Sequence, residues 1–257
     1  MPVRKTVAFT IGVALCTGIL GTGCAQEPDA PSAREPRTPS SDAPRPAPPH
    51  PAAPAAPAAP ARLLPGLGPA MQGRVPATTT QALVVRGTTQ DANRARAALY
   101  ERDAGHGWRL VAGPWRAHNG LQGWTTDHWV GDLRTPVGVF GLSDAGGLLP
   151  DPGTRLPYDQ DPLFRAEGTG HLGEPLEGSF DYVVAVDYNR VSGTTPLDET
   201  KPMGAARGGG VWIHVDHRGP TSACISLSED HMRALLRALD PARKPVVVMG
   251  PNAELSK

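Results

Sequence analysis

The sequence predicts a mainly β fold with one main helix packed against the sheet. Short runs of apolar and β-branched residues, separated by turn residues, recur between residues 81 and 250. One segment in this stretch has a helical repeat instead, and a last apolar run follows it. A chain with this pattern buries the apolar face of its helix against the sheet.

Six segments have the composition of strands. They are rich in apolar residues and are bounded by turn residues, as expected of half-buried strands. Pro136 begins one of them, where a missing N–H is tolerated, although Gly138 weakens the same strand. The expected strands are residues 81–86, 96–101, 107–111, 136–142, 182–187 and 245–249.

Residues 229–239 are expected to form the main helix. Ser228 precedes the segment and is placed to cap its first turn, and Asp240 and Pro241 end it. The apolar side chains that should pack on the sheet recur at i, i+3, i+4 and i+7, at Met232, Leu235, Leu236 and Leu239.

Residues 1–26 have the pattern of a secretory signal. Arg4 and Lys5 precede an apolar run over residues 7–20, and small residues follow it. The run is shorter than the roughly 20 residues that cross a bilayer. This length favours a signal peptide over a permanent transmembrane helix.

The residues before Cys24 resemble a bacterial lipobox, in which the cysteine becomes the lipidated first residue of the mature protein. Gly21 stands where lipoboxes usually carry Leu, and Leu20 is one position away. The alternative is ordinary cleavage after Ala25, with Gly23 as the other small residue of the cleavage site. Both predict an extracytoplasmic protein, which is a membrane-anchored lipoprotein in the first case and secreted in the second.

Residues 27–80 are dominated by Pro and Ala and are expected to form a disordered tether. Proline-rich chains favour an extended helix of about 3.1 Å per residue, so a stiff tether of this length spans on the order of 150 Å. A ligand for proline-recognising modules is the alternative. The expected domain then covers residues 81–250, and residues 251–257 form a C-terminal tail.

The charges of the chain are balanced. Lys and Arg number 25 and Asp and Glu number 25, and no basic stretch stands out. A nucleic-acid-binding protein is expected to carry such a stretch. We therefore expect no nucleic-acid partner.

Cys224 is the candidate nucleophile. Cys16 and Cys24 both lie in the export segment, so Cys224 is an odd cysteine in an exported chain. His214 lies ten positions earlier, and a polar, turn-prone segment between them lets the chain loop back. An imidazole that accepts the thiol proton activates a cysteine. The alternative is a buried cysteine that acts as a small apolar residue.

Four segments resemble the L,D-transpeptidase catalytic domain family (YkuD-like), in its actinobacterial type. Residues 210–214 (GVWIH) and 220–227 (PTSACISL) match its histidine and Ser/Thr-x-Gly-Cys segments. Residues 131–140 (GDLRTPVGVF) look like its turn and strand, and residues 187–189 (DYN) precede the histidine as in that type. The resemblance covers about residues 81–250 and implies a β-sandwich-like fold whose main helix follows the catalytic cysteine.

The resemblance also implies acyl transfer on peptidoglycan stem peptides, without a cofactor. Cys224 would form a thioester, His214 would be the general base, and Thr221 would be the Ser/Thr of the motif. Backbone N–H groups near Ala223 and Cys224 would form an oxyanion hole, with Ser222 beside them.

Two positions depart from the family pattern. Ala223 replaces the Gly before the cysteine, and Ser226 replaces an Arg that is suited to holding substrate charge. They motivate a non-catalytic wall-binding protein of the same fold as an alternative. With water as the acceptor, the enzyme would be an L,D-carboxypeptidase.

The histidine segment allows two further interpretations. His214, Asp216, His217 and Cys224 are all ligand types for zinc. However, residues three apart on a strand face opposite sides, so no metal is expected. Asp216 either orients the His214 imidazole or lies in solvent as a loop residue.

Aromatic residues and one loop complete the candidates. Four tryptophans, Trp108, Trp115, Trp124 and Trp129, either pack in the core or stack on glycan or peptide. His171 lies in a Gly-rich segment between Leu163 and Phe180 that would act as a lid over the site.

Overall fold

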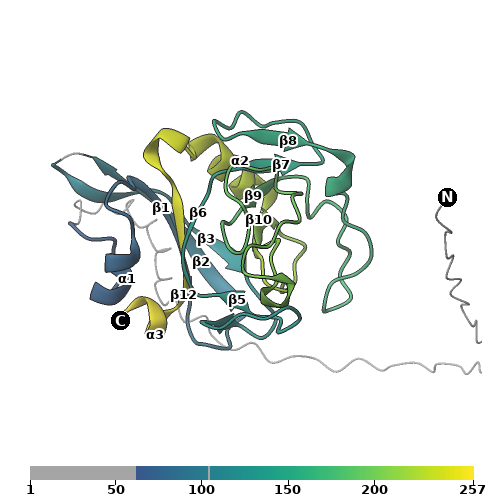
Figure 1. Ribbon diagram of the computed structural model, residues 1–257, viewed down its shortest axis with the longest axis horizontal. Helices are drawn as coiled ribbons and strands as arrows, with labels where there is room; N and C mark the ends of the chain where they lie inside the picture. The colour runs from purple at the N-terminus through teal and green to yellow at the C-terminus, as the bar shows by residue number, and fades with distance from the viewer. Residues whose placement is uncertain (1–61, 104) are drawn as a thin grey trace, which may run out of the picture. The chain divides into compact units, whose positions relative to one another are not determined.

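The computed structural model describes residues 62–103 and 105–257 and has a mainly β fold (Figure 1). Ten of its strands join in one curled sheet in the order β6-β12-β1-β2-β3-β11-β10-β9-β7-β8. The prediction of a mainly β fold with one main helix is confirmed. Residues 1–61, which include the expected signal, Cys24 and most of the tether, lie outside the described residues.

Along the chain, the strands alternate with a few short helices. The strands of the curled sheet are β1 (Gln81–Gly87), β2 (Arg94–Asp103), β3 (Gly107–His118), β6 (Gly138–Gly141), β7 (Ala145–Gly147), β8 (Tyr158–Gln160), β9 (Val183–Ala185), β10 (Trp212–Val215), β11 (Ile225–Leu227) and β12 (Val246–Pro251). A two-stranded pair is formed by β4 (Trp124–Thr125) and β5 (Thr135–Pro136). The helices are α1 (Pro69–Arg74), α2 (Glu229–Ala238) and α3 (Asn252–Leu255), with 3-10 turns η1 (Pro162–Phe164), η2 (Ala205–Arg207) and η3 (Pro241–Arg243).

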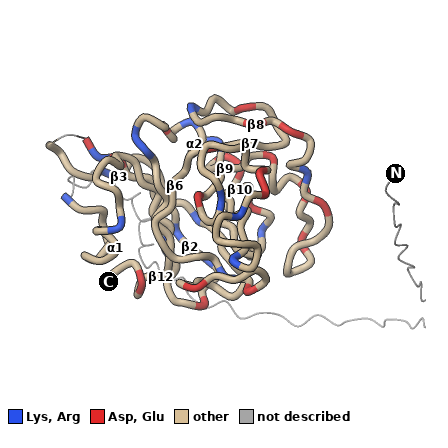
Figure 2. Tube along the Cα trace, in the orientation of Figure 1, with Lys and Arg blue, Asp and Glu red and all other residues tan. Residues whose placement is uncertain are grey.

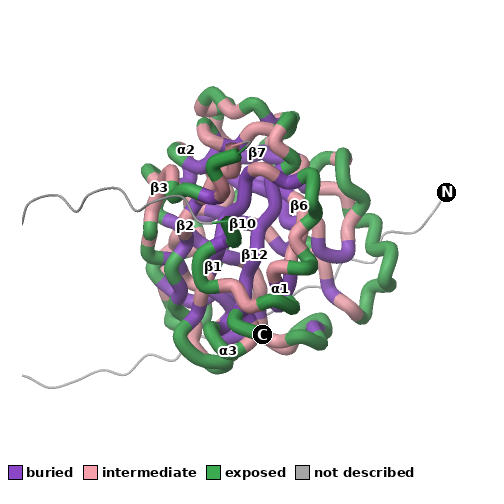
Figure 3. The backbone as a smooth tube through the Cα atoms, turned by 90° about the vertical axis from the view of Figure 1, so that its left-hand side faces the viewer, coloured by how far each residue is buried: buried purple, intermediate pink, exposed green. Residues whose placement is uncertain are grey.

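The core lies along the centre of the curled sheet. β1 is parallel to β12 and antiparallel to β2, and every residue of β12 is buried. Figure 3 shows buried backbone running through β1, β12 and β10, whereas the surrounding loops are exposed. A strand buried on both faces reads as a continuous apolar run, which is why residues 245–249 were recognisable in the sequence.

Two expected strands differ from the observed ones. The segment 136–142 is split, because Thr135–Pro136 pairs with β4 whereas Gly138–Gly141 pairs with β12. β3 extends to His118, well beyond Val111. It passes through Gly113 and Pro114, which normally end a strand, because register shifts between β2 and β3 accommodate them.

Helix α2 has the predicted limits to within one residue. The Ser228 hydroxyl accepts a hydrogen bond from the His231 N–H at 3.4 Å, and Glu229 and Asp230 occupy the first turn. Negative charge there is favourable at the positive end of the helix dipole. The apolar face is buried, as its spacing predicted.

Truncation of this face should destabilise the domain. Leu236 is fully buried, so Leu236→Ala is expected to lower the free energy of unfolding by about 2–5 kcal/mol. Arg237→Ala on the exposed side of the same helix removes only a hydrogen bond to the Pro152 carbonyl and should change it by about 1 kcal/mol or less. Urea denaturation measures both values. Equal effects would mean that α2 does not hold the core together.

The expected domain limits, residues 81 and 250, are too narrow. Leu64 is 1% exposed and Met71 5% exposed, and both belong to the core. The Gly68 N–H donates to the Leu255 carbonyl at 2.8 Å, so α1 and α3 lie side by side (Figure 1). Elements this short carry too few residues to show a helical repeat in the sequence.

A separate finding concerns the helices. Within residues 62–103 and 105–257, none is long and apolar enough to cross a bilayer.

Candidate active site

Cys224 lies at the end of the turn that leads into β11. Its Sγ accepts a hydrogen bond from the Trp212 N–H at 3.4 Å and donates to the Gly210 carbonyl at 3.6 Å. Both partners are backbone groups at the start of β10, which is parallel to β11. The thiol is therefore positioned by the neighbouring strand and not by a disulfide.

His214 lies on β10 and is 3% exposed. Its Nδ1–H donates to the Val215 carbonyl at 2.8 Å, which leaves Nε2 as the nitrogen that can accept a proton. The Phe180 ring meets the imidazole edge-on at 5.3 Å, and the His217 ring stacks on it at 5.8 Å. No hydrogen bond joins His214 to Cys224 among the described residues, although both line one pocket.

Burial keeps both groups neutral. It raises the pKa of Cys224 to about 11 and lowers the pKa of His214 to about 4. At neutral pH the pair is therefore a thiol and a neutral imidazole. A neutral imidazole is the form that accepts a proton during attack on a carbonyl.

The lowered pKa of His214 should make stability depend on pH. Because the unfolded residue titrates near 6.5, the unfolded chain binds a proton between about pH 4 and 6.5 that the folded chain does not bind. The free energy of unfolding should thus fall by on the order of 3 kcal/mol as the pH drops through this window. Urea denaturation of His214→Gln should lack this loss, whereas His171→Gln, which removes an exposed histidine, should keep it. If the free energy of unfolding fell equally with pH in both variants, the lowered pKa would not belong to His214.

The pocket around the pair has a volume of about 290 Å³. The Cys224 turn and β10 form one side of it, and the segment predicted as a lid forms the other. His171 from that segment places its Nε2 3.3 Å from the Ser222 hydroxyl. The lining residues are Ala166, Thr169, Gly170, His171, Leu176, Ser179, Phe180, His214, His217, Pro220, Thr221, Ser222 and Cys224.

Thr221 shapes the turn that carries the thiol. Its hydroxyl donates to the Cys224 carbonyl at 2.6 Å, and its N–H donates to the Asn119 carbonyl at 3.0 Å. None of the loop, turn and side-chain hydrogen bonds in residues 62–103 and 105–257 uses the N–H of Ala223 or Cys224. The oxyanion hole that the resemblance implies at these two N–H groups stays a prediction.

Ala223, at the position where the resembled family pattern has Gly, carries no backbone strain. Among the described residues, those other than glycine with positive φ are Leu133, Asn189, Arg218 and Lys244. Ala223 is not one of them, so its side chain is compatible with the turn.

Two predicted site residues have other roles. Asp216 accepts hydrogen bonds from His118 Nδ1 and the Ser226 hydroxyl, both at 2.7 Å, so it does not orient His214. Burial raises the pKa of Asp216, but the hydrogen bonds from His118 and Ser226 outweigh it and hold this pKa below its ordinary value. Ser226 is fully buried and does not line the pocket, so it is not placed to take the substrate-binding role of the Arg that the family pattern has there. Asp216 does not reach His214 because β10 ends at Val215 and the chain then turns toward β11 and β3.

His217 is bound by the segment between Leu163 and Phe180. Its Nδ1–H donates to the Glu174 carboxylate at 3.0 Å, and Glu174 also accepts a hydrogen bond from the Leu172 N–H. A side chain built on Gly219 would collide with this carboxylate. Within the part of the chain that the structure describes, no group of three or more His, Cys, Asp and Glu side chains is arranged to hold a metal ion.

Glu174 and Ser179 are functional-site residues that the sequence does not predict. Ser179 is 2% exposed and lines the pocket, and its hydroxyl has no hydrogen-bond partner among the described residues. An unpaired buried hydroxyl is costly unless a ligand or water satisfies it. Neither residue has a sequence signal, because each acts through contacts with residues about 40 positions away.

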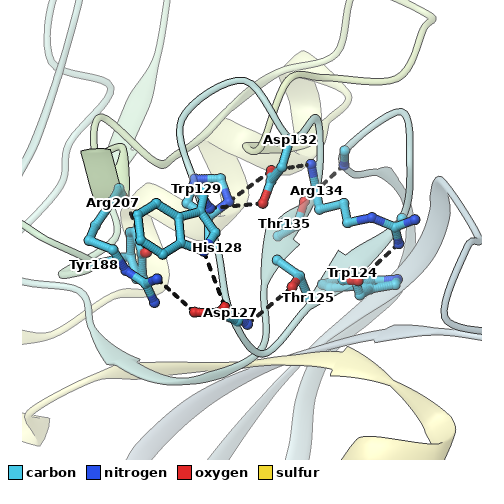
Figure 4. A network of polar contacts seen from close by, with 12 residues as sticks. Trp124, Thr125, Asp127, His128, Trp129, Asp132, Arg134, Thr135, Tyr188 and Arg207 are labelled. Carbon is cyan, nitrogen blue, oxygen red and sulfur yellow. Dashed lines mark hydrogen bonds and ion pairs between the residues drawn. The ribbon is translucent and has the colours of Figure 1, made fainter. Parts of the chain in front are cut away.

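A network of polar contacts supports the segment before β10 (Figure 4). Arg207 pairs with Asp127 at 2.6 Å, and its guanidinium lies 4.4 Å from the ring centre of Trp129. The Tyr188 hydroxyl donates to the Arg207 carbonyl at 2.9 Å. The network ties the loop between β4 and β5 to the glycine-rich segment that supplies the Gly210 carbonyl to the thiol.

The four tryptophans differ in burial, and core packing is confirmed for three of them. Trp108 and Trp124 are 1% and 0% exposed and belong to the core. Trp115 packs against the core and stacks on His231. Trp129 is 49% exposed, with its ring over Arg207.

The sequence was also compared with known proteins. A scan against protein-family models gives no match, and a search of curated proteins finds no relative.

Proposed function

We propose that this domain is a cysteine acyltransferase acting on peptidoglycan stem peptides, with the L,D-transpeptidase reaction. The observation that carries the proposal is the pocket that Cys224 and His214 share. A thiol, an imidazole with a free Nε2 and unused N–H donors beside the sulfur are the groups that acyl transfer requires. The similarity of residues 210–214 and 220–227 to the family motifs supports the substrate class.

The first half of the reaction forms a thioester. Sγ of Cys224 attacks the carbonyl carbon of the third stem residue while Nε2 of His214 takes the thiol proton. The N–H groups of Ala223 and Cys224 stabilise the oxyanion. The C–N bond then breaks, and His214 gives its proton to the amine of the departing D-Ala.

The second half releases the enzyme. An amine of a second stem attacks the thioester, and His214 accepts a proton from it. The C–S bond breaks, and the sulfur regains its proton from His214. With water in place of the amine, the product is a shortened stem, which is the carboxypeptidase outcome.

Intact mass spectrometry of the full chain after incubation with a carbapenem tests the nucleophile. A stoichiometric adduct on Cys224 is expected, and Cys224→Ala should give none. Purified tetrapeptide stems then identify the acceptor, since a cross-linked dimer indicates an amine and a tripeptide indicates water.

A non-catalytic wall-binding protein is the second candidate, and the lack of a hydrogen bond between Cys224 and His214 among the described residues favours it. No adduct on a folded protein whose thiol is free would replace the enzyme with this candidate. Cys224→Ala would then bind the wall as the unaltered protein does.

The proposal includes export through residues 1–26 and a lipid anchor on Cys24. Cys24→Ala should move the protein from the membrane fraction to the medium. An unchanged distribution, together with an N-terminus after Ala25, would favour ordinary cleavage.

A further inference from the structure

A second concave surface lies on the sheet, apart from the Cys224 pocket. We call it the arginine groove. Its volume is about 870 Å³, and its basic residues come from β1, β2, β3 and the loop after β10. Figure 2 shows several Lys and Arg positions close to β2. The five arginines that line the groove are Arg86, Arg94, Arg96, Arg116 and Arg218.

Sheet register places these charges side by side. Arg86 lies opposite Arg96, and Arg96 lies opposite Arg116, so three arginines form one row across β1, β2 and β3. Arg94 lies opposite His118 in a second row. Like charges directly opposite each other on a sheet repel and destabilise it. Such an arrangement is relieved when an anion binds between the charges.

The protein itself does not neutralise the groove. None of the ion pairs in residues 62–103 and 105–257 involves any of the five arginines. Asp216 is the one acidic residue of the lining, and His118 and Ser226 already bind its carboxylate. Arg218 has a φ of 69°, so the fold holds a residue in the left-handed region at this position.

The spacing of the charges suits a chain with repeated anionic groups. Adjacent strands lie about 4.8 Å apart, and residues two apart on a strand lie about 6.7 Å apart. The charges therefore form a strip on the order of 10 Å across, and a single small anion would reach only part of it. Guanidinium groups bind phosphate through paired hydrogen bonds.

The lining contains no Phe, Tyr or Trp. Proteins that hold single-stranded nucleic acid stack its bases on such side chains. The lining therefore disfavours single-stranded nucleic acid, and its arginines fit the phosphates of another phosphodiester chain. We propose that the arginine groove binds a polyol-phosphate chain. This inference goes beyond the proposed function and does not depend on it.

The groove also has a defined relation to the pocket. His118 lies opposite Ser226, and Ser226 lies opposite His214, so one register row leads from the groove to the candidate base. Asp216 joins His118 to Ser226 along this row. A polymer bound in the groove would therefore lie two strands away from His214.

Fluorescence anisotropy of the full chain with a labelled, synthetic glycerol-phosphate oligomer tests the proposal. The double variant Arg96→Glu/Arg116→Glu should weaken binding by at least about tenfold, because it removes two charge-assisted contacts. Lys201→Glu/Arg237→Glu makes the same change in net charge at exposed positions outside the groove and should alter binding less than about twofold. Arg96→Gln/Arg116→Gln should give an intermediate loss, and circular dichroism checks that each variant is folded.

Three outcomes would overturn the proposal: equal losses in the two double variants, stronger binding of single-stranded DNA of matched charge, or stronger binding of polyglutamate. Cys224→Ala should bind the oligomer as the unaltered protein does. Loss of acylation and loss of polymer binding are therefore separate results.

Discussion

Replacing His214 by Gln is expected to slow acylation of Cys224 by a carbapenem by about 10²–10⁴-fold at pH 7. With a pKa of about 11, the thiol is ionised to only about one part in ten thousand at neutral pH. The unaltered protein avoids this limit because Nε2 of His214 takes the proton during attack. The variant must use the rare thiolate.

The pH dependence separates this role from a structural one. The rate of His214→Gln should rise about tenfold per pH unit from pH 7 to 10, whereas the unaltered protein should be nearly flat above about pH 5. Stopped-flow measurement of acylation gives both profiles. His217→Gln is the matched control, because His217 stacks on His214 but holds no reacting proton. An unchanged rate at pH 7 in His214→Gln would mean that another group is the base.

The second large effect concerns stability. Arg190→Met is expected to lower the free energy of unfolding by about 3–5 kcal/mol, because it leaves buried carboxylates unpaired. The Arg190 side chain is 5% exposed and pairs with Asp144 at 3.0 Å and Asp187 at 2.6 Å. It also donates to the Thr194 carbonyl at 2.6 Å.

Urea denaturation of Arg190→Met measures the loss. Arg233→Met is a suitable control, since its ion pair with Glu229 is on the surface and should contribute at most about 1 kcal/mol. Similar losses in the two variants would show that the buried network adds little. Near-native stability of Arg190→Met would also show that the buried network adds little.

The strands and the main helix could be predicted because their patterns are local. Helix α2 has a capping residue and a full apolar face, and β12 has an uninterrupted apolar run. The short helices α1 and α3 could not be predicted, because each owes its place to backbone contacts with the other. The extension of β3 past Pro114 depends on its pairing with β2, which the sequence does not display.

The candidate site was partly predictable for a related reason. Cys224 and His214 stand out by residue type and spacing, and the structure brings them to one pocket. The group that orients His214 is the carbonyl of Val215. Every residue has a backbone carbonyl, so the sequence cannot indicate this contact. The prediction that Asp216 orients His214 was wrong because β10 ends before Asp216, whose side chain binds His118 instead. The rows of arginines could not be predicted from the sequence, because they depend on how the strands pair.

The contact between α1 and α3 has a mechanical consequence. The hydrogen bond from Gly68 to Leu255 lies close to Leu64, where the described chain begins to enter the core, so a pull applied upstream loads α3 and the β1–β12 pair first. In the sheet, β2 and β3 stand between β1 and the strands that carry Cys224 and His214. A force on the chain before Leu64 would therefore reach this end of the sheet before it reached the reacting groups.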